Sequence, residues 1–100
     1  MRAKLEIPGQ QLAEFCRRNR IRKLSLFGSV LRDDFGPDSD VDVLVEFEPD
    51  AAVGLSFFQM QEELGELLGH KVDLNTRGFL SKYFRDEVEA EAEEAYVAEE

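Results

Sequence analysis

The chain has 100 residues, 43% of them hydrophobic, and its 22 Asp and Glu against 12 Lys and Arg give a formal net charge of -10. This length and apolar share predict one globular domain with a single core over residues 1–100. The acidic balance argues against a DNA-binding protein, because DNA phosphates would be repelled. The single cysteine excludes an intramolecular disulfide and favours the cytoplasm, and no apolar run is long enough to span a membrane.

The negative charge is unevenly distributed. Residues 1–85 hold 12 basic and 14 acidic side chains, whereas residues 86–100 hold 8 acidic side chains and no basic one. The sequence therefore predicts an acidic C-terminal helix or tail over residues 86–100 on a nearly neutral body. Such a segment could offer an acidic face to a basic partner, or it could be a solvated helix.

The first half of the chain predicts a helix and two strands. Helical spacing indicates a helix over residues 10–19, with Leu12, Phe15 and Cys16 on its buried face. Alternating and β-branched residues predict strands over residues 23–27 and 40–47, and a short helical stretch over residues 29–35 lies between them.

The second half predicts a helix, a third strand and a long last helix. Apolar residues three and four apart favour a helix over residues 57–68 that stops at Gly69, and His70 falls in the turn that follows. A strand over residues 71–75 and a helix over residues 80–96 complete the order αβαβαβα. This order predicts an α+β fold, with a small three-stranded mixed sheet flanked by helices.

Gly28 and Ser29 stand where a strand ends and a helix is expected to begin. Such a turn exposes backbone N–H groups that favour an anion, and glycine allows a ligand to approach the backbone closely. The pair therefore fits a phosphate-binding turn. A plain turn in which Ser29 caps the helix is the alternative.

Three aspartates lie on predicted strands. Asp40 and Asp42 share one face because side chains two apart on a strand point the same way. Asp73 joins them if the third strand runs parallel to the second, for which the intervening helix is the required crossover. Three carboxylates on one surface repel one another, and Mg²⁺ would offset that charge. Solvent-facing strand residues are the alternative.

Together these residues resemble the minimal nucleotidyltransferases of the polymerase β superfamily. Their pattern is Gly-Ser, ten residues, Asp-x-Asp and a later third Asp, and it is matched by Gly28-Ser29, Asp40-Val41-Asp42 and Asp73. The chain is most similar to MntA-like antitoxins of HEPN/MNT toxin–antitoxin systems. The resemblance implies a nucleotidyltransferase fold for the single domain, ATP as substrate and two Mg²⁺ ions.

The resemblance also implies roles for individual residues. Asp40, Asp42 and Asp73 would be catalytic and hold the metals, and the nucleotide would contact Gly28, Ser29, Val30, Arg32 and Ser39. The implied reaction transfers AMP to a tyrosine hydroxyl of a HEPN-domain (HepT-like) RNase toxin and neutralises it. A non-catalytic antitoxin that only covers its toxin is the alternative, and transfer to a small molecule is a third option that the size of the pocket would discriminate.

Several basic residues allow two interpretations. Arg32 could reach a phosphate or the acceptor, or pair with a neighbouring aspartate. Lys82 and Arg85 could meet nucleotide or partner, although a solvated helix face is the simpler interpretation. The cluster over residues 17–23 could bind RNA or an acidic partner, and an exposed, charged helix end is the alternative.

Overall fold

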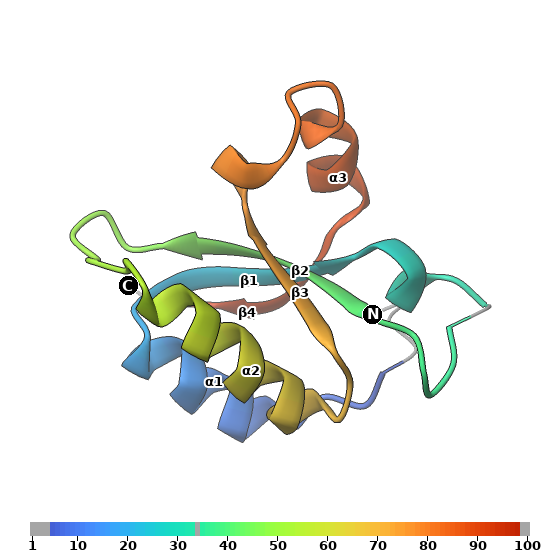
Figure 1. The fold of residues 1–100 in the computed structure, drawn as a ribbon, viewed down its shortest axis with the longest axis horizontal. Coiled ribbons are helices and arrows are strands. Elements are labelled where there is room, and N and C mark those ends of the chain that lie inside the picture. The colour runs from blue at the N-terminus through green and yellow to red at the C-terminus, as the bar shows by residue number, and fades with distance from the viewer. Residues whose placement is uncertain (1–4, 34, 99–100) are drawn as a thin grey trace.

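The structure is a computed structural model that describes residues 5–33 and 35–98. Its sheet has the strand order β3-β2-β1-β4, in which β2 and β3 are parallel and the other neighbours antiparallel (Figure 1). No helix in these two ranges is long and apolar enough to cross a membrane. The elements are α1 (Gly9–Arg18), β1 (Ile21–Phe27), the 3₁₀ turn η1 (Gly28–Leu31), β2 (Val41–Phe47), α2 (Ser56–Leu68), β3 (Val72–Thr76), the 3₁₀ turn η2 (Arg77–Phe79), α3 (Arg85–Glu91) and β4 (Glu93–Val97).

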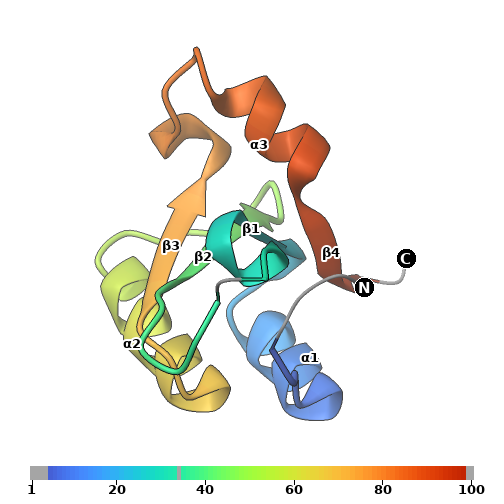
Figure 2. The ribbon, with the colours of Figure 1, turned by 90° about the vertical axis from the view of Figure 1, so that its right-hand side faces the viewer.

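Helices α1 and α2 cover one face of the sheet, and η2 and α3 stand over the other (Figures 1 and 2). The core lies between the sheet and α1 and α2. Alternate strand residues point into it, including Leu24, Leu26 and Val43, and they meet Phe15 of α1 and Leu64 of α2. Strand side chains alternate between the two faces, so the residues between the core-facing ones point to the opposite face, toward η2 and α3. We call it the open face.

The predicted order is confirmed as far as β3, within one or two residues at most boundaries. Helix α2 ends at Gly69, whose left-handed backbone (φ 72°) lets its N–H bond the carbonyl of Gly65. It then supplies the crossover that the parallel pair β2 and β3 requires. Cys16 is a core residue as expected, with no exposed surface.

The predicted helix over residues 80–96 is wrong on both sides of Arg85–Glu91, because residues 80–84 form turns and the chain is no longer helical beyond Glu91. The chain turns extended at Ala92, and β4 pairs antiparallel with β1, Leu26 facing Glu93 and Lys23 facing Val97. The sheet thus has four strands, and residues 86–98 of the acidic segment are divided between α3 and β4. The reason is the free edge of β1, whose unpaired backbone groups are satisfied by a fourth strand.

The predicted helix over residues 29–35 is also wrong in extent. Only Gly28–Leu31 form a 3₁₀ turn, and Arg32 is already extended (φ -112°, ψ 159°). A four-residue turn suffices to redirect the chain into the loop that leads to β2. The alternative in which Ser29 caps a helix is not supported, because Phe27 occupies the capping position and no side chain caps the turn.

Candidate active site

Asp42 of β2 and Asp73 of β3 are partners in the parallel register. Their strand neighbours Val41 and Val72 are buried in the core, so the alternating aspartates face the open side of the sheet. Asp40 precedes β2 by one residue and is exposed. The structure therefore brings Asp42 and Asp73 side by side, as predicted from the crossover.

Gly28 packs directly against Asp42. Its backbone is left-handed (φ +75°), and a Cβ placed there would collide with Asp42 Oδ2 and lie 3.3 Å from Cγ. Phe27 is the register partner of Asp42, so the end of β1 delivers Gly28 to this carboxylate. Glycine is required here by both the backbone conformation and the close approach.

The carboxylates share one electrostatic environment. Burial raises the pKa of Asp42, the charges of Asp73 and Asp40 raise it further, and Arg32 opposes them. Glu91 of α3 also raises this pKa, so a fourth carboxylate acts on the site. These are hard oxygen donors whose repulsion a divalent cation would relieve, which fits Mg²⁺. Among residues 5–33 and 35–98, however, no three acidic, His or Cys side chains are already gathered as a metal-binding group.

Hydrogen bonds hold the loop that carries Asp40. Ser29 Oγ donates to the Asp40 carbonyl over 3.2 Å, and the Gly36 N–H donates to Ser39 Oγ over 3.0 Å. His70 Nδ1 lies 3.0 Å from the Ser39 carbonyl, and its ring packs on Phe35 with centroids 4.9 Å apart. His70 therefore positions this loop. Sequence reasoning gave it no role, since only the folded loop brings it to Ser39.

Val30 and Arg32, which are also predicted to contact the nucleotide, differ in burial. The side chain of Val30 is fully buried, so only its backbone could face a ligand. Arg32 is exposed, and it pairs with Glu91 over 3.4 Å. This ion pair joins the end of η1 to α3 across the open face. Arg32 lies close enough to lower the pKa of Asp42, which places it beside the carboxylates.

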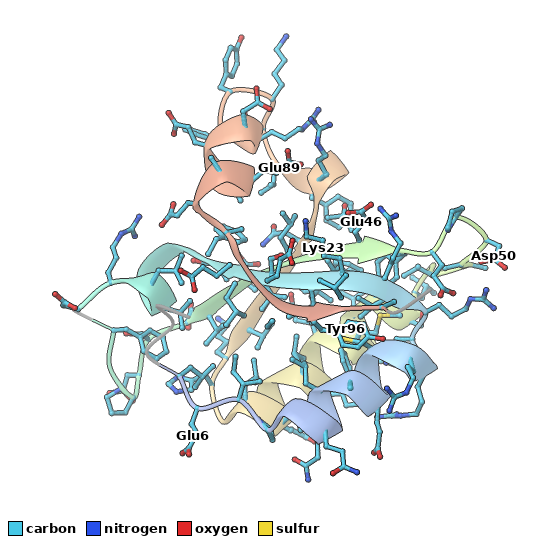
Figure 3. The ribbon with its side chains drawn as sticks, turned by 180° about the vertical axis from the view of Figure 1, so that it is seen from behind. Glu6, Lys23, Glu46, Asp50, Glu89 and Tyr96 are labelled. Carbon is cyan, nitrogen blue, oxygen red and sulfur yellow. The ribbon has the colours of Figure 1, made fainter. Side chains whose placement is uncertain are left out.

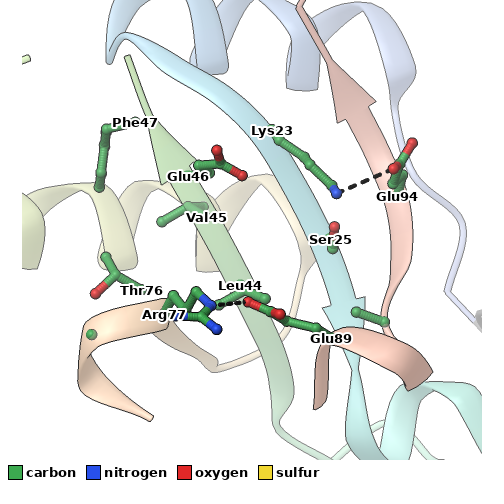
Figure 4. A pocket seen from close by; sticks show the side chains of 12 residues that line it. Lys23, Ser25, Leu44, Val45, Glu46, Phe47, Thr76, Arg77, Glu89 and Glu94 are labelled. Carbon is green, nitrogen blue, oxygen red and sulfur yellow. Dashed lines mark hydrogen bonds and ion pairs between the residues drawn. The ribbon is translucent and has the colours of Figure 1, made fainter. Parts of the chain in front are cut away.

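A cavity of about 650 Å³ lies on the open face between the sheet and the η2–α3 segment (Figure 4). Its lining includes Leu44, two residues after Asp42 on β2, but none of Asp40, Asp42 and Asp73. Ser25 and Leu44 line its floor, and Arg77 and Glu89 line its roof. Figure 3 shows Lys23, Glu46 and Glu89 on this side of the sheet, whereas Tyr96 points to the side covered by α1. The volume is typical of a site for a small molecule or a side chain.

The family follows from a comparison with known domains. A family model described as a nucleotidyltransferase domain matches residues 9–97. The chain belongs to the nucleotidyltransferase domain family. It is 37% identical over 73 residues to a candidate protein adenylyltransferase of Methanocaldococcus jannaschii, MJ0128, covering 70% of this chain and 71% of that protein. It is 44% identical over 54 residues to the protein adenylyltransferase MntA of Thermococcus cleftensis, covering 54% of each.

Solved structures confirm the nucleotidyltransferase fold. A candidate minimal nucleotidyltransferase matches with a TM-score of 0.70 at 32% identity, over 85% of this chain and 86% of that one. A toxin–antitoxin with AMP-PNP gives 0.73 at 19% identity, over 92% and 75%. A tri-AMPylated Shewanella oneidensis HEPN toxin in complex with its MNT antitoxin gives 0.59 at 20% identity, over 90% and 70%. At these identities the last two show the fold alone.

The basic cluster of this nucleotidyltransferase is largely ion-paired. Arg18 pairs with Glu63 over 2.9 Å, Arg20 with Asp50 over 2.6 Å, Arg22 with Glu46, and Lys23 with Glu94 over 3.2 Å. This favours the exposed, charged surface over an RNA-binding patch.

Of the two basic residues expected on the last helix, only Arg85 lies on it. Lys82 precedes α3 and sits over the ring of Tyr83, 5.5 Å from its centroid. Arg85 begins α3 and donates to the Leu80 carbonyl over 3.3 Å. Both contacts join residues of the η2–α3 segment to one another, so they assign neither Lys82 nor Arg85 to the nucleotide site.

Proposed function

We propose that this chain is an MntA-like antitoxin that transfers AMP from ATP to a tyrosine hydroxyl of a cognate HEPN-domain RNase toxin and so neutralises it. Two kinds of relative support this: proteins named protein adenylyltransferase, and structural neighbours that are toxin–antitoxin complexes, one with AMP-PNP and one with an AMPylated toxin. The reaction would take place in the cytoplasm, where ATP is available and a free thiol stays reduced.

The observation that carries the proposal is the pairing of Asp42 with Asp73 against a glycine that leaves room for Asp42. We propose that Asp40 and Asp42 hold two Mg²⁺ ions and that Asp73 completes the ligands of one of them. When bound, the ions would stabilise both the attacking and the leaving oxygen of an in-line displacement. A stabilising role for the carboxylates in the unliganded fold does not explain the arrangement, because burial and then the charges of Asp73 and Asp40 raise the pKa of Asp42, which disfavours its charged form.

The residues of the chain itself would position the reactants. The backbone of the Gly28–Ser29 turn would bind the β- and γ-phosphates, and Arg32 would exchange its ion pair with Glu91 for a phosphate oxygen. The acceptor oxygen would then form a bond to the α-phosphorus while the bridging bond to the β-phosphate breaks. Pyrophosphate leaves, and the hydroxyl proton passes to the carboxylate of Asp73.

The test is transfer of label from α-labelled ATP, with Mg²⁺, to the purified product of the neighbouring gene, which the proposal expects to be a HEPN-domain toxin. We expect label on the partner with the wild-type chain and with Asp50→Asn, which changes an exposed loop carboxylate. We expect a loss of at least 100-fold in Asp42→Asn, because the variant keeps the shape of the side chain and removes its charge. Undiminished labelling in Asp42→Asn would refute the assigned mechanism.

A binding antitoxin without catalysis is the second candidate. It is favoured by one observation, that the described carboxylates are not gathered as a metal-binding group. The two candidates separate in a toxin RNase assay without nucleotide. If the Asp40→Asn/Asp42→Asn double variant neutralises the toxin as well as the wild-type chain does, coverage and not AMP transfer is the function.

A further inference from the structure

The floor of the cavity is formed in part by residues that follow Asp42 along β2. On β2 the side chains that face the open side are Asp42, Leu44 and Glu46 in succession, and the register places Ser25 opposite Leu44. Two residues along a strand span about 7 Å. The floor of the cavity therefore starts one such step beyond Asp42, on the side away from Gly28.

We propose that this cavity receives the hydroxyl-bearing side chain of the acceptor protein, with Ser25 and Leu44 as the residues that select it. The proposal rests on the proposed function, in which the Gly28–Ser29 turn holds the leaving pyrophosphate. An in-line displacement requires the attacking oxygen opposite the leaving group, with the reacting phosphorus between them. Gly28 lies at one end of the row and the cavity at the other, so the acceptor enters from the cavity.

The charges of the cavity agree with a neutral occupant. Its walls carry two cations and three carboxylates, and two ion pairs cross them: Lys23 with Glu94 over 3.2 Å and Arg77 with Glu89 over 2.5 Å. A polyphosphate would meet a net negative lining here. A phenol or alkyl hydroxyl would not, and the aliphatic stems of Lys23 and Arg77 offer it apolar contact.

Ser25 is the polar group that the fold leaves for the occupant. Among residues 5–33 and 35–98, Ser25 is the one polar or charged residue that is buried, with 3% of its surface exposed, and it lies at the floor of the cavity (Figure 4). No hydrogen bond of its hydroxyl to residues 5–33 or 35–98 is seen. Because this hydroxyl can both donate and accept, it can form a hydrogen bond with the hydroxyl of an acceptor side chain that enters the cavity.

The rim of the cavity favours an acceptor that is part of a protein. Residues 77–85 run from the roof at Arg77 and Gly78 to the start of α3, and they contain three basic and no acidic residues. Phe79, Tyr83 and Phe84 of this segment are 60–79% exposed. These three residues do not line the cavity, but they lie on the segment that supplies its roof. Exposed aromatic side chains are typical of protein interfaces, whereas a small acceptor bound in the cavity would not contact them.

The closing experiment separates acceptor binding from nucleotide binding. The first variant is Leu44→Phe, which places a larger side chain on the floor of the cavity, and its control is Leu55→Phe, which adds the same ring at a position 85% exposed. We expect Leu44→Phe to lower transfer to the partner at least 10-fold and to leave AMP-PNP affinity within 2-fold of wild type. A parallel loss of AMP-PNP affinity would place the nucleoside in the cavity, and unchanged transfer would exclude the cavity; either result overturns the proposal.

A second measurement does not depend on transfer. Wild-type chain saturated with AMP-PNP and Mg²⁺ is titrated with N-acetyl-tyrosinamide, and amide shifts are recorded by NMR. We expect shifts at Ser25, Leu44, Thr76 and Gly78. Their absence from these positions would refute the acceptor pocket even if the partner is labelled. If the partner is never labelled but these shifts occur, the cavity assignment stands and the proposed function fails.

Discussion

The contact between Gly28 and Asp42 leads to the sharpest test of the site. In Gly28→Ala the new methyl group must share space with Asp42 Oδ2, and the backbone must hold a left-handed conformation (φ +75°). That conformation costs a residue with a Cβ about 1–2 kcal/mol. The collision adds a displacement of the Asp42 carboxylate, since the strand behind it is fixed by its pairing with β1 and β3.

Gly69→Ala is the matched control. Gly69 has nearly the same backbone (φ +72°), but a Cβ there meets nothing within 4 Å. Both variants should therefore lose about 1–2 kcal/mol, or about 4–16 °C in Tm for a domain of this size. Only Gly28→Ala should lose AMP transfer, by about 100-fold, because a shift of about 1 Å at a catalytic group has an effect of that order.

The assay combines thermal unfolding followed by circular dichroism with the labelled-ATP transfer assay on the same preparations. Equal losses of stability with a selective loss of transfer support the close approach as a feature of the active site. If Gly28→Ala transfers AMP as well as Gly69→Ala does, Asp42 does not need its observed position. The reasoning that links Gly28 to catalysis would then be wrong.

The other predictions concern α3, the buried thiol and the core. Glu91→Gln should free Arg32 and remove a charge that acts on Asp42, so ATP should bind up to about 5-fold more tightly by calorimetry, with Glu87→Gln unchanged. Burial raises the pKa of Cys16 to about 12 from its ordinary value of 9.0, so iodoacetamide at pH 8 should label it only in urea; rapid native labelling would contradict its burial. Because the unfolded thiol ionises first, stability should fall between about pH 9 and 12, where Cys16→Ala should show a smaller loss. Leu64→Ala should cost about 2–5 kcal/mol in urea unfolding, and Phe58→Ala on the exposed side of α2 much less.

The parts of the fold that sequence predicted are those with strong local signals. Helix α2 has apolar residues at regular spacing and a terminal glycine, and β2 has a β-branched run, so each is specified by its own residues. Asp42 and Asp73 could be placed together because a helix between two strands implies a parallel pair. Strand β4 could not be predicted: its residues Glu93–Val97 continue an apolar spacing that also suits a helix, and only the free edge of β1 decides.

The contacts that complete the site depend on tertiary structure alone. His70 meets the Ser39 carbonyl across 31 positions of sequence, and Arg32 meets Glu91 across 59. Neither pair has a spacing or motif that sequence reasoning can use. The same holds for Gly28: its residue type suggested a turn, but the reason for glycine is the carboxylate beside it.

The described part of the acidic segment, residues 86–98, is folded into the domain as α3 and β4. Asp86 and Glu89 face Arg77, Glu94 faces Lys23, and Glu91 faces Arg32, so these charges are balanced by basic residues from the body of the domain. Residues 86–98 are therefore not a free acidic tail, and most of their charge is already paired within the domain instead of offered to a basic partner. Instead, α3 and β4 form the roof and one wall of the cavity, and Glu91 acts on Asp42 itself. A partner that contacts Glu91 would break its ion pair with Arg32 and lessen the repulsion at Asp42. Arg32 would then be able to bind a phosphate, so docking of the acceptor protein would strengthen nucleotide binding.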